Sequence, residues 1–550
     1  MTNVRGPTWW MLVLLGLVLW AGGDVRRGLW APDEARYAYV AREMREGHTW
    51  FIPHLHGEPY PDKPPLMFWL INAGSVFTGG RINGFAARLP SLLGAILALW
   101  ATARLMERWR DGAAAWRAVA VLMTAYLFWW EAGWGQIDML LCGLEMMSLW
   151  CFFTATDPGH ARRFIGAYVF AGFATFAKGP VGLAVPFGVY AFALWAAGEA
   201  RTLKRAHWLW GIPIACAIPG VWLLVAWLQG APHDYFAAMF GAKSFGRVIQ
   251  DHHAQKFYYY LPHFLGEFLP WTLFLPAAYR GLEPGPLRRR LVAWAAFVLV
   301  LFSCFVGKRN LYILPMWPAL AMIVAAGWDG FAGLTPRWPR VTGWIVLGFT
   351  TVLGLVETGV FLVAKLGLVG HFVHRDADVV TDFLAAHPGM PWTLVPGAIL
   401  LLVGNTVLIG WFQRDGLTRR WFAVFAALLF GHEILLSTFV LPSFNALKAP
   451  LELSAEARTR LLPGQPIYLY YPAQLAIVPL YADRPGRYLR SPDEIEHLLA
   501  DGAYGIIVFN EEDWTPLAER FANRVRARPF TIGSGKLVWV DFPPPATAAP

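Results

Sequence analysis

Residues 31–70 read APDEARYAYVAREMREGHTWFIPHLHGEPYPDKPPLMFWL and lie between two apolar regions. The stretch mixes acids and bases with Trp, Tyr and Pro, so it is too polar to cross a bilayer. Asp33 and Glu34 are adjacent carboxylates, and Lys63 stands before two prolines that restrict its backbone. We predict that the stretch lies at a membrane surface, where its charged groups stay hydrated and reactive. A solvated loop with helix-cap acids is the alternative reading.

The composition is that of a polytopic helical membrane protein. Of the 550 residues, 56% are hydrophobic and 15% are charged, whereas soluble domains carry about a quarter charged residues. The mean hydropathy is +0.42, and apolar runs recur as far as residue 442. The net charge of +9 therefore indicates cytoplasmic loops and anionic lipid head groups, and no nucleic acid is expected as a partner.

The apolar runs predict about thirteen transmembrane spans. Lysine and arginine follow every even-numbered span, and cytoplasmic loops collect these residues. The N-terminus is then cytoplasmic, and the loops 29–85 and 230–263 face outward, as does everything after Pro442. The spans are expected near residues 8–23, 86–104, 115–132, 139–155, 164–177, 180–198, 208–229, 264–280, 291–306, 311–328, 343–368, 393–412 and 421–441.

Several basic residues on the predicted outer side oppose this orientation bias. A group of cations near the outer surface indicates a bound anion, and in a membrane that anion is a lipid phosphate. For any single residue, a snorkelling side chain is the alternative. Lys178 and the pair Lys308 and Arg309, however, stand in very short hairpins. The group comprises Lys63, Lys178, Lys243, Arg247, Lys256, Lys308 and Arg309.

The composition changes after the last span. We predict a transmembrane domain at 1–443 and an outer mixed α/β domain at 444–550, with strands at 466–471, 504–509 and 536–541. Ser491 is a predicted N-cap for a helix that runs to Leu499, with Glu494 at the capping-box position. A further helix is predicted at 512–522. This domain is expected to act as a scaffold or to face the acceptor.

The stretch 31–70 resembles the first outer loop of the aminoarabinose transferases, which belong to the GT-C class alongside the protein O-mannosyltransferases. The family is expected to carry Glu before the lysine of its KPP motif, where this chain has Asp62. The resemblance covers the membrane half well and the C-terminal end only by position. It continues with GQIDMLL around Asp138, FAKGPVGL around Lys178, DHHAQKFYYYLP at 251–262 and KRNLYILPMWPAL at 308–320.

The resemblance implies transfer of 4-amino-4-deoxy-L-arabinose from undecaprenyl phosphate to a lipid A phosphate. The reaction would take place on the periplasmic side of a bacterial inner membrane and would give resistance to polymyxin and other cationic antimicrobial peptides. Asp33, and after it Asp138, is the candidate that orients or deprotonates the acceptor. The departing phosphate needs cations more than it needs an acid. We expect that phosphate to meet Lys63, Lys243, Arg247, Lys308 and Arg309, and the substrates to contact Glu34, Tyr37, Tyr60, Lys178, Tyr260 and Tyr312.

No cofactor is required by this chemistry. Asp62 and His253 are candidates for a divalent metal such as Zn, Mg or Mn, although their spacing fits no standard ligand motif. A protein O-mannosyltransferase-like enzyme is the nearest alternative function. A lipid flippase or transporter is another, but such proteins usually contain internal repeats and midplane charges. No repeat is evident, and the unusual charges gather at one surface.

Overall fold

The computed structural model describes residues 26–240, 254–332, 334, 337–372, 377–471, 476–501, 504–533 and 535–542. The chain forms two compact units. Unit 1 comprises residues 1–26, 61–66 and 88–441, and unit 2 comprises residues 27–60, 67–87 and 442–550. Parts of the first outer stretch therefore share a unit with the C-terminal region.

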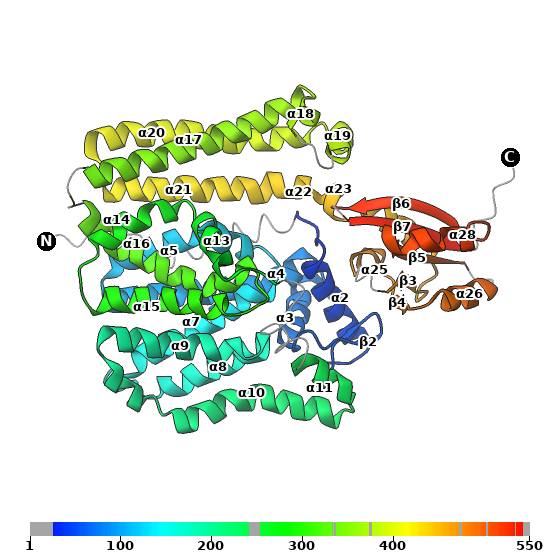
Figure 1. Cartoon of the computed structure of the whole chain (residues 1–550), viewed down its shortest axis with the longest axis horizontal. Helices are drawn as coiled ribbons and strands as arrows, with labels where there is room; N and C mark the ends of the chain where they lie inside the picture. Colours follow the sequence, from blue (N-terminus) through cyan, green and yellow to red (C-terminus); the bar gives the residue numbers. More distant parts are fainter. Residues whose placement is uncertain are drawn as a thin grey trace. The chain divides into compact units, whose positions relative to one another are not determined.

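Unit 1 is a bundle of helices (Figure 1). Within it α7 packs on α8, α8 on α10, and α9 on α15, while α17 packs on α20. Its helices are α4 (Gly84–Trp109), which begins in unit 2, α5 (Gly112–Met123), α6 (Tyr126–Ala132), α7 (Ile137–Ala155), α8 (Arg163–Lys178), α9 (Val181–Ala197), α10 (Trp208–Leu228), α11 (His233–Phe240), α13 (Tyr260–Glu267), α14 (Leu275–Gly281), α15 (Pro286–Ser303), the 3-10 helix η6 (Asn310–Met316), α16 (Trp317–Ala332), α17 (Arg337–Lys365), α18 (Val369–Phe372), α19 (Ala377–Ala386), α20 (Val395–Asp415) and α21 (Arg419–Leu435).

The predicted spans after the first coincide with helical segments, while the first, at 8–23, lies outside the described residues. Among the described residues, 7 helices are long and apolar enough to cross a membrane, or 8 if the bent pair α5 and α6 forms one span. The structure differs from the prediction at 264–280, where α13, a 3-10 turn at Trp271–Phe274 and α14 replace one long helix. Pro270 explains the break, because it lacks the N–H that would continue α13.

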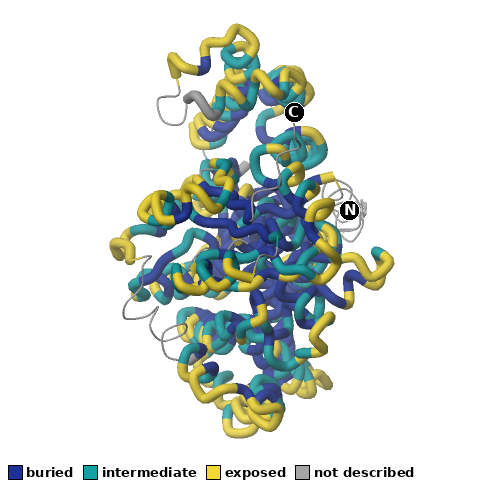
Figure 2. The backbone as a smooth tube through the Cα atoms, turned by 90° about the vertical axis from the view of Figure 1, so that its right-hand side faces the viewer, coloured by how far each residue is buried: buried dark blue, intermediate teal, exposed yellow. Residues whose placement is uncertain are grey.

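The position of α7 is set by a close approach to α4. A Cβ atom on Gly143 would lie 2.3 Å from the carbonyl oxygen of Gly94, so a larger residue cannot fit there without separating the helices. Nearly all of α7 is buried. Figure 2 shows such buried stretches, in dark blue, within the helices. The backbone at the start of α7, where Asp138 lies, is therefore firmly held.

Unit 2 contains a mixed five-stranded sheet. Its strand order is β4-β3-β5-β7-β6, with β3 parallel to β4 and β5, and β7 antiparallel to β5 and β6. The main elements of the unit are α2 (Asp33–Glu46), β1 (His54–Leu55), β2 (Glu58–Pro59), α3 (Leu66–Ser75), α24 (Leu451–Arg460), β3 (Ile467–Tyr470), α25 (Ile477–Ala482), β4 (Gly486–Leu489), α26 (Pro492–Ala500), β5 (Gly505–Asn510), α27 (Glu511–Trp514), α28 (Ala518–Phe521), β6 (Arg526–Ile532) and β7 (Gly535–Phe542).

The sequence predicted the centre of this sheet and missed its edges. The three predicted strands correspond to β3, β5 and β7, and the Ser491 hydroxyl accepts a hydrogen bond from the Glu494 amide at 3.3 Å, as an N-cap should. The helix predicted at 512–522 is divided into α27, a 3-10 turn and α28. The edge strands β4 and β6 were not predicted, because β6 (RARPFTI) has no buried residue and no regular alternation of apolar residues, and β4 has only four residues.

Helix α2 is joined to the C-terminal part of unit 2 by buried polar contacts. The Arg42 guanidinium donates to the Arg484 carbonyl at 2.8 Å, and the Gly486 amide donates to the Tyr39 hydroxyl at 2.5 Å. The Glu43 carboxylate accepts from the Gly57 amide at 3.1 Å and from Tyr39 at 3.3 Å. Burial raises the pKa of Glu43 to about 7. The loop predicted to be hydrated is thus folded into a buried helix.

This buried carboxyl gives unit 2 a defined pH dependence. Glu43 keeps its proton in the folded state up to a pKa of about 7 but loses it above its ordinary pKa of 4.5 when unfolded. Folding should therefore lose stability as the pH rises from about 4.5 to 7, by roughly 3 kcal/mol at most. In thermal melts across this range, the melting temperature of Glu43→Gln should rise relative to that of the wild type as the pH increases. The control Glu46→Gln, an exposed acid on the same helix, should run parallel to the wild type. A constant gap between Glu43→Gln and the wild type would contradict this assignment.

Candidate active site

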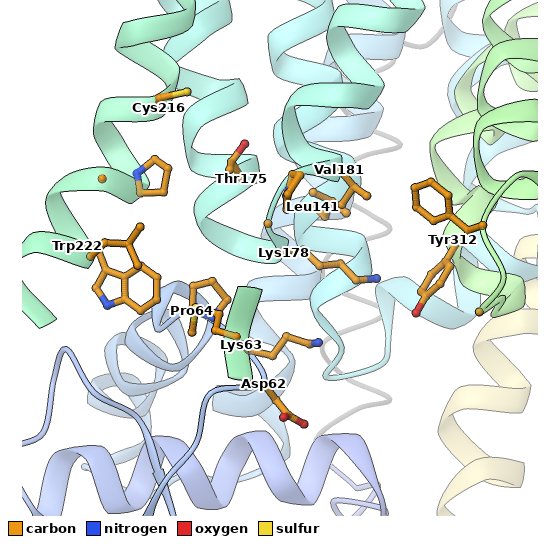
Figure 3. Close-up of a pocket in the computed structure, with 18 of the residues that line it drawn as sticks. Asp62, Lys63, Pro64, Leu141, Thr175, Lys178, Val181, Cys216, Trp222 and Tyr312 are labelled. Carbon is orange, nitrogen blue, oxygen red and sulfur yellow. The ribbon is translucent and has the colours of Figure 1, made fainter. Parts of the chain in front are cut away.

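Unit 1 contains a cavity of about 300 Å³ with apolar walls and a polar end (Figure 3). It lies where α8 ends and α9 begins, beside α10 and the C-terminal end of α15. The polar end is made by Asp62, Lys63, Lys178 and Tyr312. The walls include Leu141, Val181, Cys216, Pro219, Trp222, Leu223, Met239, Phe302 and Phe305.

An ion pair between Lys178 and Asp138 forms the base of the polar end. Asp138 lies in the first turn of α7 and Lys178 in the last turn of α8, where the helix dipoles favour an acid and a base respectively. Gly179 has a φ of +84°, which suits glycine and ends α8 directly after the lysine. The Lys178 ammonium lies 4.3 Å from the centroid of the Tyr312 ring, within cation–π range. These contacts fix one cation at the cavity.

Lys63 supplies a second cation. Only 9% of its surface is exposed. Figure 3 shows the amines of Lys63 and Lys178 pointing to the same side, toward the Tyr312 hydroxyl. Two ammonium groups and a phenol at one end of an apolar cavity suit an anion that carries an apolar chain. The structure thus brings together three of the residues predicted to meet the substrates.

Lys308 lies next to this cavity, but its ammonium group donates to backbone carbonyls. It is 5% exposed and donates to the carbonyls of Gln255, at 3.0 Å, and Phe305. Burial lowers the pKa of Lys308. Arg309 follows it as the residue before η6. Lys308 therefore holds the hairpin that follows α15, and Phe305 and Gly307 of that hairpin line the cavity.

The Tyr260 side chain is fully buried, and its hydroxyl has no hydrogen-bond partner among the described residues. Burial is the main cause that raises its pKa, and the fields of Tyr312 and Asp138 add to the effect. Tyr260 is therefore close enough to the polar end to interact electrostatically with it. Lys243, Arg247 and His253 lie outside the described residues.

The carboxylates predicted in the first outer stretch belong to unit 2. Asp33 is ion-paired with Arg36, and Glu34 is ion-paired with Arg27 at 3.1 Å and accepts from the Trp30 amide at 3.2 Å. Asp33 is 5% exposed and Glu34 is fully buried. The expected hydration of these two acids is therefore wrong, because arginines replace the water around them.

Tyr37 and Tyr60, the other predicted substrate-binding residues of unit 2, pack on one phenylalanine. Their ring centroids lie 5.8 and 6.2 Å from that of Phe68. Both tyrosines are buried. This packing stabilises the segment between α2 and α3.

The sequence reasoning missed Glu145, which lies on α7 seven residues after Asp138 and therefore on the same helix face. It is 1% exposed, and neither carboxylate oxygen has a hydrogen-bond partner among the described residues. An acid inside an apolar span is itself a signal of function, so this residue could have been found. It also interacts electrostatically with Lys178.

The structure leaves the metal prediction open. Within the described residues, no group of three or more His, Cys, Asp or Glu side chains is arranged to hold a metal ion. Asp62 lines the cavity, and His253 is outside the described part of the chain.

The chain is similar to known membrane glycosyltransferases. A family model described as dolichyl-phosphate-mannose-protein mannosyltransferase matches residues 62–227. An undecaprenyl phosphate-α-4-amino-4-deoxy-L-arabinose arabinosyl transferase from Edwardsiella ictaluri is 28% identical over 468 residues, which cover 82% of this chain and 80% of that protein. A protein of the same name from Shewanella sediminis is 30% identical over 381 residues, 66% of each chain.

The fold also matches solved structures. The crystal structure of ArnT from Cupriavidus metallidurans bound to undecaprenyl phosphate aligns with a TM-score of 0.79 and 20% identity, over 99% of this chain and 100% of that one. The apo structure of the same protein aligns with a TM-score of 0.78 over 97% of each chain.

The chain is therefore a multi-span membrane glycosyltransferase with the GT-C fold and a C-terminal strand sheet. The resemblance to the aminoarabinose transferases that was expected from the first outer stretch is confirmed by these relatives.

Proposed function

We propose that this chain transfers 4-amino-4-deoxy-L-arabinose from undecaprenyl phosphate to a phosphate of lipid A. The reaction takes place at the periplasmic face of a bacterial inner membrane. The sugar brings an ammonium group to an anionic lipid surface, which weakens the attraction of polymyxin and other cationic peptides. The observation that carries the proposal is the cavity of unit 1, with two lysines and a tyrosine at the end of apolar walls.

The donor fits this cavity by its chemistry. The polyprenyl chain lies against apolar side chains such as Leu141, Trp222 and Phe302, and the phosphate meets Lys63, Lys178 and Tyr312. When the bond between the sugar and the phosphate breaks, negative charge builds on the phosphate, and fixed cations stabilise it. The ion pair with Asp138 aims Lys178 at that group, which gives Asp138 a positioning role in addition to the role predicted for it.

Asp33 acts on the acceptor or on the amino group of the sugar. A lipid A phosphate is already anionic at neutral pH, so the carboxylate of Asp33 orients the acceptor or the sugar amine and is not needed as a strong base. Glu34, buried and paired with Arg27, keeps the start of α2 in place.

A protein O-mannosyltransferase-like activity is the second candidate, and the family model over residues 62–227 favours it. The two candidates share the polyprenyl-phosphate donor and differ in the acceptor. The named aminoarabinose relatives match a larger share of the chain, so we rank lipid A first.

Replacing Lys63 tests the donor site. Lys63→Ala should weaken binding of undecaprenyl phosphate to the purified protein at least tenfold, because a charge-assisted contact to the phosphate is lost. Lys63→Arg should keep part of the affinity. The control Lys536→Ala removes the same charge from an exposed side chain on β7 in unit 2 and should bind normally. Equal affinities for Lys63→Ala and the wild type would remove Lys63 from the donor site.

Replacing Asp33 tests the acceptor step. Asp33→Asn keeps the shape of the side chain and removes its charge, so turnover should fall at least ~10²-fold at saturating donor. Donor binding should change much less, because the lysines of unit 1 hold the phosphate. The exposed control Asp501→Asn should turn over normally. Near-normal turnover in Asp33→Asn, with an unchanged melting temperature, would move the role to Asp138.

A further inference from the structure

A second cavity lies at the opposite end of the same helices. The donor cavity uses the start of α7, the start of α9 and the end of α15, whereas the second cavity uses the end of α7, the second half of α9 and the start of α15. Its volume is about 290 Å³. It is lined by Arg108, Trp109, Tyr190, Glu199, Thr202 and Arg290, among others. The same helices therefore contribute to both cavities, but the two cavities have no lining residue in common.

Two arginines from different helices line this cavity. Arg108, near the end of α4, is ion-paired with Asp157, and Arg290, near the start of α15, is ion-paired with Glu199. The Arg290 guanidinium lies 5.8 Å from the centroid of the Trp109 ring. Each carboxylate accepts from only some of the five N–H groups of its arginine. The cavity thus holds more donors than acceptors.

The Tyr190 hydroxyl is the clearest sign of a missing acceptor. Tyr190 is 1% exposed, lines the cavity, and has no hydrogen-bond partner among the described residues. The Nε of Arg290 is likewise buried and without a partner in the described part of the chain. Buried donors are almost always satisfied, so an acceptor from outside the chain is expected here.

We propose that this second cavity binds a phosphate oxyanion. Its oxygens would accept from Arg108 and Arg290 in the forked geometry that guanidinium groups favour, and from the Tyr190 hydroxyl. The neighbouring helix ends carry further arginines and lysines, including Arg163 at the start of α8 and Arg201 and Lys204 after α9. Such residues gather on the cytoplasmic side, where the leaflet is anionic. A phospholipid head group is therefore the expected source of the phosphate, and free phosphate is the other source. The proposal does not depend on the function of the donor cavity.

The test compares two buried tyrosines. Tyr190→Phe removes the hydroxyl without a partner, while Tyr168→Phe removes a hydroxyl that donates to the Ala206 carbonyl at 2.5 Å outside the cavity lining. Without ligand, Tyr190→Phe should melt at or above the wild-type temperature, whereas Tyr168→Phe should melt lower. The full-length protein in detergent is then titrated with dihexanoylphosphatidylglycerol, with inorganic phosphate, or with the matching diacylglycerol.

The wild type and Tyr168→Phe should be stabilised by the phospholipid, and Tyr190→Phe should bind it about tenfold more weakly. Arg290→Gln should lose binding further. The shift should persist in Lys63→Ala, which shows that the donor cavity is not the source. Stabilisation by inorganic phosphate with the same dependence on Tyr190 would support the oxyanion site and assign its ligand to free phosphate. Equal stabilisation by the diacylglycerol, no stabilisation at all, or unchanged affinity in Tyr190→Phe would overturn the proposal.

Discussion

The ion pair between Asp138 and Lys178 is the contact on which the cavity lined by Lys63 and Lys178 depends. It links the first turn of α7 to the last turn of α8, and these two helices pack against each other along much of their length. The pair is nearly buried, and a buried charge without its partner is strongly destabilising. Removing either residue would thus disturb the bundle as well as the site. The close approach of Gly143 to Gly94 also holds this site in place, because it fixes the helix that carries Asp138.

This arrangement also explains how a membrane enzyme keeps cations in an apolar environment. Lys178 is neutralised by Asp138 and lies beside Tyr312, so it is stable before a substrate arrives. Lys63 follows Asp62 and precedes Pro64, which keep it at the polar end of the cavity. The second cavity repeats the principle with arginines, each partly balanced by a carboxylate.

The membrane fold could be predicted because long apolar runs indicate transmembrane helices, and because the lysines and arginines that follow alternate runs indicate their orientation. Lys63 and Lys178 could be singled out because each is a cation in an unexpected place. Their common cavity could not be predicted, since Asp138 and Lys178 are joined only by the packing of α7 on α8. Lys308, like Lys178, was singled out as a cation in a short hairpin, yet it donates to backbone carbonyls. A lysine in a hairpin can bind an anion or donate to the backbone, and the two cases look alike in the sequence. Glu145 was missed although an acid in an apolar span is informative. The break at Pro270 was missed because the run around it is mostly apolar.

The most direct test of this account is reconstitution of the reaction. The purified full-length protein is placed in liposomes with undecaprenyl-phosphate aminoarabinose and lipid A, and the lipids are analysed by mass spectrometry. The account predicts that lipid A gains one aminoarabinose on a phosphate, that undecaprenyl phosphate is released in equal amount, and that a protein acceptor is not modified. Folded protein that binds undecaprenyl phosphate but leaves lipid A unchanged, while the relative from Edwardsiella ictaluri modifies it under the same conditions, would contradict the account.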